Sequence, residues 1–102
     1  MDKSVRPEPN PGEILLDGHI DVPEERLAAV SAALPDHIEL TRGEPGCRYF
    51  SVTACPDLAG RFLVSEIFAD QTAFEAHQTR MSASAWAEVT GDIPRQYKIR
   101  TA

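Results

Sequence analysis

The sequence predicts a single α+β domain in which strands and helices follow the order β-α-β-β-α-β. Apolar residues alternate along residues 13–22, and a helical spacing then follows up to residue 41. Two further alternations, at residues 47–55 and 61–68, are separated only by the short segment PDLAG, which favours an antiparallel hairpin. A helical stretch and a last strand pattern complete the chain.

Length and charge limit the classes of function. At 102 residues the chain is long enough for one hydrophobic core. Its formal charge of −6 argues against a nucleic-acid partner, because phosphate binding needs a concentrated Lys/Arg surface. No apolar run approaches the roughly 20 residues that cross a membrane, and no signal peptide is recognised. We therefore expect a cytoplasmic protein with no membrane partner.

The N-terminal region differs from the rest of the chain. Residues 1–12 carry prolines and little to bury, so we expect a disordered or extended tail followed by the domain at 13–102. In the first strand, Ile14, Leu16, Ile20 and Val22 fall on one side, and Leu15 falls on the other side with the polar residues.

The first helix contains a proline. Helical spacing runs from residue 23, and Pro35 is expected to break or kink the helix, with residues 35–41 continuing as a second short segment. The tripeptide EPG at 44–46 then predicts a turn.

The second half supplies the remaining elements. Asp70 is expected to cap a helix at residues 71–81, a shorter helical piece covers 82–89, and a last strand covers 95–101. This order is the ferredoxin-like arrangement, an antiparallel sheet with helices on one face. The other face would need a partner to cover its apolar residues, which predicts a homodimer.

Metal binding is not expected. Cys47 and Cys55 on one continuous strand would lie too far apart to form a disulfide, and no CxxC motif is present. The three histidines show no metal-binding spacing.

Several motifs resemble those of a known family. The stretches TRGEPGCRYFSV, FLVSEIFADQTAFEAHQ, SAWAEVT and RQYKI resemble the antibiotic biosynthesis monooxygenase (ABM) family, over residues 13–100. The resemblance implies a ferredoxin-like protomer paired into a dimeric α+β barrel, with a pocket between sheet and helices. The family includes cofactor-free monooxygenases of quinols and polycyclic phenols, haem-degrading relatives and isomerases of small signalling sugars. The fold alone therefore does not fix the activity.

One departure from the family pattern is informative. The haem-degrading relatives and some polyketide-oxidising members use an asparagine in the pocket. The single asparagine of this chain, Asn10, lies in the tail. This departure argues against haem degradation and against a direct copy of the polyketide-oxidising mechanism.

Two residues are the catalytic candidates. His77 follows Ala73 and Phe74 on the apolar face of its helix and would suit a general base, although a structural histidine bonded to a backbone carbonyl fits as well. The resemblance implies that a histidine at this position borders the pocket. Glu66 alternates with apolar residues, so its carboxyl group is expected on a buried face. It would orient His77, act as an acid of raised pKa, or form an ion pair with Arg48 or Arg61. The ion pair is the favoured interpretation.

Five further residues are candidates for substrate binding. Trp86, Tyr49 and Phe74 would form aromatic walls, although such aromatic residues usually fill cores. His37, in the loop-like segment PDHIEL, could reach the pocket mouth, and Arg61 could bind an anionic oxygen or remain a solvated charge.

The leading hypothesis is a cofactor-independent, ABM-type monooxygenase that oxidises a small quinol or hydroxylated aromatic with dioxygen. His77 would take the phenolic proton, and the electron-rich anion would react with oxygen without a metal or flavin. The alternatives are an isomerase or lyase of a small metabolite, using His77 and Glu66, and a non-catalytic dimeric small-molecule binding protein.

Overall fold

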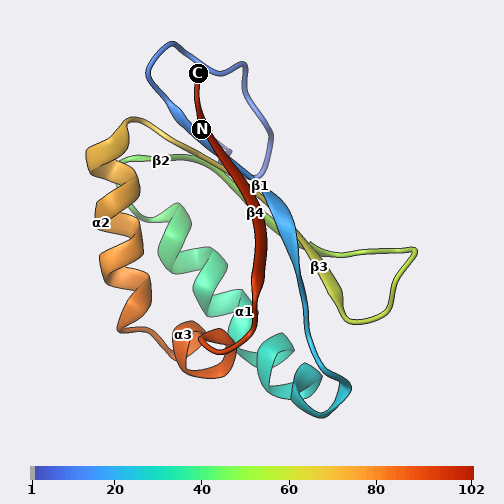
Figure 1. Ribbon diagram of the computed structural model, residues 1–102. Coiled ribbons are helices and arrows are strands. Elements are labelled where there is room, and N and C mark those ends of the chain that lie inside the picture. The colour runs from blue at the N-terminus through green and yellow to red at the C-terminus, as the bar shows by residue number, and fades with distance from the viewer. Residues whose placement is uncertain (1) are drawn as a thin grey trace.

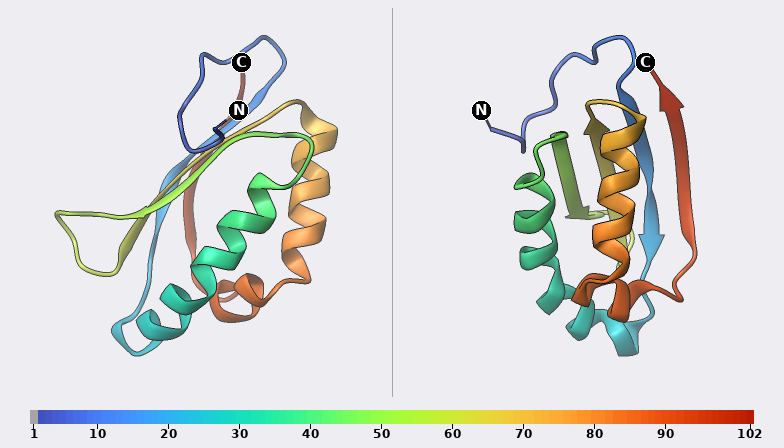
Figure 2. Two further views of the ribbon diagram at one scale, coloured as in Figure 1. Left: turned by 180° about the vertical axis from the view of Figure 1, so that it is seen from behind. Right: turned by 90° about the vertical axis from the view of Figure 1, so that its left-hand side faces the viewer.

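The computed structural model describes residues 2–102 and shows a four-stranded antiparallel sheet with its helices on one face (Figures 1 and 2). The sheet order is β2-β3-β1-β4, which is the predicted ferredoxin-like order. In chain order the elements are β1 (Ile14–Asp21), a 3-10 turn η1 (Glu24–Arg26), α1 (Leu27–Arg42), β2 (Cys47–Ala54), β3 (Arg61–Phe68), α2 (Gln71–Ser82), α3 (Ala85–Thr90) and β4 (Arg95–Thr101).

The predicted strand boundaries are confirmed to within a residue or so, because alternation along a half-buried strand is a local signal. The cap of α2 is also confirmed: the Asp70 side chain accepts a hydrogen bond from the Ala73 backbone N–H at 2.8 Å. Among the described residues, no helix is long and apolar enough to span a bilayer.

The helix does not break at Pro35. Pro35 lies inside α1, which the structure assigns as one continuous helix from Leu27 to Arg42. The missing N–H of proline costs one hydrogen bond, and burial of the apolar face against β2 and α3 offsets that loss. The prediction of a second, separate segment is therefore wrong.

A bulge near Arg48 changes the expected pattern of β2. The register between β2 and β3 shifts between Cys47 and Tyr49, so Cys47 and Phe50 both pack into the core. The guanidinium of the displaced Arg48 binds the buried Glu13 carboxylate, with N–O distances of 2.8 and 2.9 Å. Arg48 is therefore not a partner of Glu66.

The N-terminal segment lies against the face of the sheet away from the helices. Residues 2–12 contain no helix or strand, but Arg6 contacts Asp17 and Ser65 and lies over the ring of Tyr49. On the same face Leu15 and Ile67 are fully buried within one chain. A partner is therefore not needed to cover this part of the sheet, whereas Leu63 further along the face remains 41% exposed.

Candidate functional site

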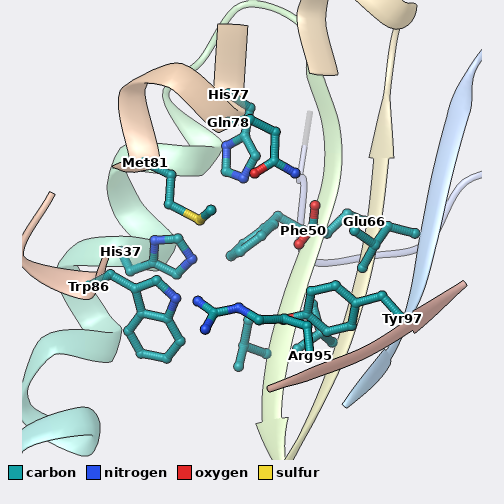
Figure 3. Close-up of a pocket in the computed structure, with 12 residues that line it drawn as sticks. His37, Phe50, Glu66, His77, Gln78, Met81, Trp86, Arg95 and Tyr97 are labelled. Carbon is teal, nitrogen blue, oxygen red and sulfur yellow. The ribbon is translucent and has the colours of Figure 1, made fainter. Parts of the chain in front are cut away.

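A cavity of about 220 Å³ lies between the sheet and the helices (Figure 3). Every strand and every α-helix contributes to its wall. Most lining side chains are apolar or aromatic, and a few are polar, which is the usual composition of a small-molecule site. The lining residues are Leu16, His37, Phe50, Val52, Val64, Glu66, His77, Gln78, Met81, Trp86, Arg95 and Tyr97.

His77 lies on the cavity side of α2, and its side chain is only 1% exposed. Its ring packs against Phe68, with ring centroids 4.7 Å apart. Nδ1 lies 3.0 and 3.1 Å from the two carboxylate oxygens of Glu44. Burial lowers the pKa of His77, while the hydrogen bond and the charge of Glu44 act in the opposite direction. The neutral form of the imidazole therefore predominates at pH 7.

Glu44 belongs to a small network behind His77. It lies in the turn after α1, where the sequence reads EPG. The Arg80 guanidinium donates to Glu44 Oε2 at 2.6 Å and also to the Thr41 hydroxyl at 3.0 Å. Glu44, rather than Glu66, is therefore the carboxylate that contacts His77.

Glu66 is a buried carboxyl group in the cavity wall. In the sheet it pairs with Leu16 on one side and Phe50 on the other, and it is 5% exposed. Its Oε1 has no hydrogen-bond partner among residues 2–102. Burial, together with the negative charges of Glu44 and Asp17, raises the pKa of Glu66 to about 8. At pH 7 the carboxyl group is therefore mainly protonated, and it can donate as well as accept.

The predicted ion pair of Glu66 with Arg48 or Arg61 is not found among the described residues. Arg61 instead binds Asp21 on the outer face of the sheet, at 2.7 and 3.0 Å. A buried carboxyl group without a cation lowers its free energy by staying protonated.

His37 lies on α1 and not in a loop, and it reaches the cavity from that helix. Its ring is parallel to the indole of Trp86, with centroids 4.6 Å apart, and meets Phe50 edge-on at 5.2 Å. Its Nδ1 is buried and has no hydrogen-bond partner in the described part of the chain. Burial lowers the pKa of His37 to about 3, assisted by the nearby His77 and the cations Arg80 and Arg95. The neutral imidazole of His37 therefore forms part of the cavity wall, and its Nδ1 is available for a hydrogen bond.

Arg95 and Tyr97 reach the cavity from β4. Arg95 donates hydrogen bonds to the backbone carbonyls of Thr90 and Ile93 and to the Thr90 hydroxyl. Figure 3 shows its guanidinium extending toward Trp86 and His37. Burial raises the pKa of Tyr97 to about 12, so its hydroxyl keeps its proton. Arg95 is the only charged side chain of the lining at neutral pH apart from the ionised fraction of Glu66.

The structure brings His77, Glu66, Trp86 and His37 of the predicted residues together around one cavity. Tyr49, Phe74 and Arg61 do not line it. Tyr49 lies on the outer face beneath Arg6, Phe74 packs against Phe68 in the core at 5.7 Å, and Arg61 pairs with Asp21. Asn10 is exposed in the N-terminal segment and also does not line the cavity.

Sequence reasoning did not identify Glu44, Gln78, Met81 and Arg95. Gln78 and Met81 follow His77 by one and four positions on α2, so helical spacing carried a signal for Met81. Arg95 opens a strand whose next inward position is Tyr97, which is a weaker signal. No local pattern connects Glu44 with His77, because 33 positions separate them. In the described part of the chain, no group of three or more His, Cys, Asp or Glu side chains could hold a metal ion.

Comparison with solved structures supports the fold. A protein from Nitrosomonas europaea, named as a candidate antibiotic biosynthesis monooxygenase, superposes with a TM-score of 0.78 at 20% identity, covering 91% of this chain and 92% of that one. A similarly named protein from Bacteroides thetaiotaomicron is 26% identical, with a TM-score of 0.69 and coverage of 89% and 88%. A protein from Shewanella oneidensis, also 26% identical, gives 0.68 with 91% of both chains covered.

Curated proteins give no match to the sequence. The family model for "Antibiotic biosynthesis monooxygenase" matches residues 13–89, which include β1, α1, the hairpin, α2 and most of α3. The matched stretch carries His37, Glu44, Glu66, His77 and Trp86, and only β4 contributes cavity residues beyond it. The resemblance inferred from the motifs is confirmed, and the chain belongs to the antibiotic biosynthesis monooxygenase family.

Proposed function

We propose that the protein is a cofactor-independent monooxygenase that oxidises a small quinol or hydroxylated aromatic with dioxygen. The proposal rests on the surroundings of His77. Its buried, mainly neutral imidazole faces an aromatic cavity, and its Nδ1 is hydrogen-bonded to the carboxylate of Glu44 on the side away from the cavity. A neutral imidazole can accept a phenolic proton, and an enclosed cavity keeps water away from the reactive anion and from the intermediates that it forms.

The cavity supports deprotonation of a phenol in two further ways. Arg95 supplies a positive charge in the wall, which lowers the free energy of a phenolate. Glu66 is mainly protonated at pH 7, so it adds a hydrogen-bond donor without adding a full negative charge. His77 would therefore remove a proton in surroundings that favour the resulting anion.

The reaction balances without a further reductant. The substrate anion transfers one electron to dioxygen, and the two radicals combine to form a carbon–oxygen bond. Loss of water from the resulting hydroperoxide gives the quinone. In this way 1-naphthol and one dioxygen give 1,4-naphthoquinone and water, and 1,4-dihydroxynaphthalene gives a hydroxynaphthoquinone and water. The substrate supplies all the electrons, and the protein supplies the base and the orientation.

The size of the cavity limits the substrate. A cavity of roughly 150 Å³ suffices for benzene. The volume of about 220 Å³ found here therefore suits one or two fused rings better than a polycyclic phenol. Trp86, His37 and Phe50 offer flat surfaces against which such rings could stack.

The deciding experiment follows oxygen uptake with 1-naphthol and 1,4-dihydroxynaphthalene under isotopically labelled dioxygen. We expect one labelled oxygen atom in each product molecule and one dioxygen consumed per substrate. Product without label, formed together with hydrogen peroxide, would identify simple oxidation and contradict a monooxygenase. Rates without protein are subtracted, because quinols oxidise spontaneously.

His77→Ala is the matching variant, and its expected loss of rate is about 10²–10⁴-fold, the usual contribution of a general base. His19→Ala removes the same side chain from β1 at a position that does not line the cavity, so its rate should equal that of the unchanged protein. Equal rates for both variants would exclude His77 as the base.

An isomerase or lyase remains the second candidate, because Glu66 is mainly a protonated acid and His77 a neutral base in one cavity. The pKa of Glu66 is raised and that of His77 is lowered, so one group can donate a proton while the other accepts one. Such a pair can transfer a proton to or from a carbon atom next to a carbonyl group. Turnover of a small carbonyl compound under anaerobic conditions would favour this candidate. Binding of aromatics without any product would leave the third possibility, a small-molecule binding protein.

We also propose that the protein forms a homodimer through the outer face of the sheet, and that residues 1–12 lie outside the family domain. The exposed Leu63 on that face supports the first proposal, and the family match that begins at residue 13 supports the second. Light scattering at micromolar concentration tests the dimer, with a chain lacking residues 2–12 as the comparison. A monomeric mass for both proteins would contradict it.

A further inference from the structure

The two ring nitrogens of His77 are not equivalent, and only one of them faces the cavity. We propose that Glu44 is the positioning residue of this site: its carboxylate accepts the Nδ1–H of His77 and so fixes the tautomer in which Nε2 is the free base. The consequence for turnover rests on the proposed function, whereas the tautomer is a property of the protein alone.

Geometry indicates which nitrogen carries the proton. Both oxygens of Glu44 lie close to His77 Nδ1, at 3.0 and 3.1 Å. An ionised carboxylate can only accept hydrogen bonds, so Nδ1 must be the donor, and a neutral imidazole has only one donor. Glu44 does not line the cavity. In Figure 3 the ring of His77 turns its other nitrogen toward the cavity.

The position of Glu44 is itself fixed. Arg80 donates to Glu44 Oε2 at 2.6 Å, and the same guanidinium is held by the Thr41 hydroxyl at 3.0 Å. The Lys3 ammonium group donates to the backbone carbonyl of Glu44 at 3.1 Å and to that of Arg42 at 2.7 Å. The carboxylate is thus fixed through both its side chain and its backbone, which leaves the imidazole little freedom to rotate.

The charges around His77 are consistent with this role. Glu44 faces the ring from the turn after α1, Arg80 lies one helical turn further along α2, His37 approaches from α1 at a ring distance of 6.3 Å, and Glu66 belongs to the opposite cavity wall on β3. His37 is neutral and Glu66 mainly protonated at pH 7. Glu44 is therefore the negative charge that stabilises the imidazolium formed when His77 accepts a proton.

The first measurement is nitrogen NMR of the ligand-free protein labelled in its histidines, with His77 assigned from the His77→Gln variant. We expect a neutral imidazole with its proton on Nδ1 and none on Nε2. A proton on Nε2 would overturn the proposal, and this result is decisive even if no variant of Glu44 folds.

The second measurement compares Glu44→Gln with Glu39→Gln, an exposed glutamate on α1 that serves as the matched control. Loss of the negative charge should shift the titration of His77 to lower pH, because the imidazolium loses its partner. Glu44→Asp keeps the negative charge, so the His77 titration should shift less than it does in Glu44→Gln. An unchanged His77 titration and tautomer in Glu44→Gln would overturn the proposal.

Turnover gives a third, separable readout. With a substrate in hand, Glu44→Gln should lower kcat by about 10²–10⁴-fold and leave KM nearly unchanged, because the carboxylate acts through His77 and does not touch the substrate. A raised KM with normal kcat would contradict the positioning role. If no oxygen-consuming substrate exists, the proposed function fails, while the NMR result still decides the role of Glu44.

Discussion

The imidazole of His37 lies parallel to the indole of Trp86, with ring centroids 4.6 Å apart and ring planes within 2° of each other. This contact joins α1 to α3 and forms one wall of the cavity. Both residues are almost fully buried, with exposed fractions of 4% and 5%. The same pair therefore contributes both to the stability of the fold and to the shape of the site.

The stacked pair predicts the effect of replacing Trp86. Trp86→Ala should lower the free energy of unfolding by about 3–5 kcal/mol, because it leaves a cavity in the core. It should also weaken the binding of 1-naphthol, whereas Trp86→Phe, which keeps an aromatic ring, should lose less of both. Urea unfolding and fluorescence titration measure the two effects. A loss below about 1 kcal/mol in Trp86→Ala would contradict the burial of Trp86 in the core.

The raised pKa of Glu66 predicts that the free energy of unfolding depends on pH. Its pKa rises from 4.5 to about 8 on folding, so the folded chain binds the proton more tightly than the unfolded chain. The stabilisation is complete below pH 4.5 and is lost as pH rises toward 8, with a slope of about 1.4 kcal/mol per pH unit. Glu66→Gln should remove this slope.

The window for this test lies between pH 6.5 and 8, above the unfolded pKa of His37. Free energies of unfolding of the unchanged protein and of Glu66→Gln are compared there. Glu39→Gln provides the control, because it changes the same charge at an exposed position. Parallel stability curves for the unchanged protein and Glu66→Gln would show that Glu66 is ionised in the fold.

The lowered pKa of His37 predicts the opposite pH dependence of the free energy of unfolding at acid pH. Its pKa falls from 6.5 to about 3 on folding, so the unfolded chain binds the proton more tightly. Stability from this group is complete above pH 6.5 and is lost as pH falls toward 3, again by about 1.4 kcal/mol per pH unit. His37→Gln should therefore lose less stability than the unchanged protein between pH 6.5 and 3.

Thermal melts across that pH range measure the difference, and His19→Gln on β1 is the control. Equal acid sensitivity of the unchanged protein and His37→Gln would mean that His37 becomes protonated within the fold. From pH 4.5 to 6.5 the effects of His37 and Glu66 oppose each other, so the two groups together leave stability nearly flat there.

Lys3 predicts that the N-terminal segment stabilises the turn that carries Glu44. Its ammonium group binds the backbone carbonyl of the last residue of α1 and that of Glu44 in the following turn, and its own carbonyl accepts the Phe50 N–H at 3.0 Å. Lys3→Met keeps the length of the chain but removes the ammonium group, and should cost about 1–3 kcal/mol. Lys98→Met, at an exposed position of β4, should cost far less. Equal unfolding midpoints for the two variants would rule out this anchoring role.

Much of the fold could be predicted because its signals are local. The alternation around Ile14 and Leu16, the cap at Asp70 and the helical spacing through Phe74 each act within a few residues, and each element formed where it was expected. Pro35 misled the prediction because its local cost is offset by packing between α1, β2 and α3, which no local pattern records.

The site was only partly predictable. The predictions placed His77 and Trp86 at a cavity, and the structure brings both there. The favoured partner of Glu66 was wrong, because Arg48 is displaced at a bulge and Arg61 points to the outer face. A strand pattern assigns a side chain to a face, but a bulge or an alternative ion pair changes its partner.

The sequence by itself determined the order of elements, the family motifs and the presence of a histidine on the inner face of α2. Only the tertiary structure decided which carboxylate meets His77 and which remains alone. Glu44 and Glu66 lie in different segments, 22 positions apart, and folding places them in different surroundings. The Glu44 carboxylate accepts a hydrogen bond from Arg80, whereas the Glu66 carboxyl group is buried among apolar side chains. Because a carboxyl group responds to its surroundings rather than to its neighbours in the chain, its charge is fixed only when the fold is complete.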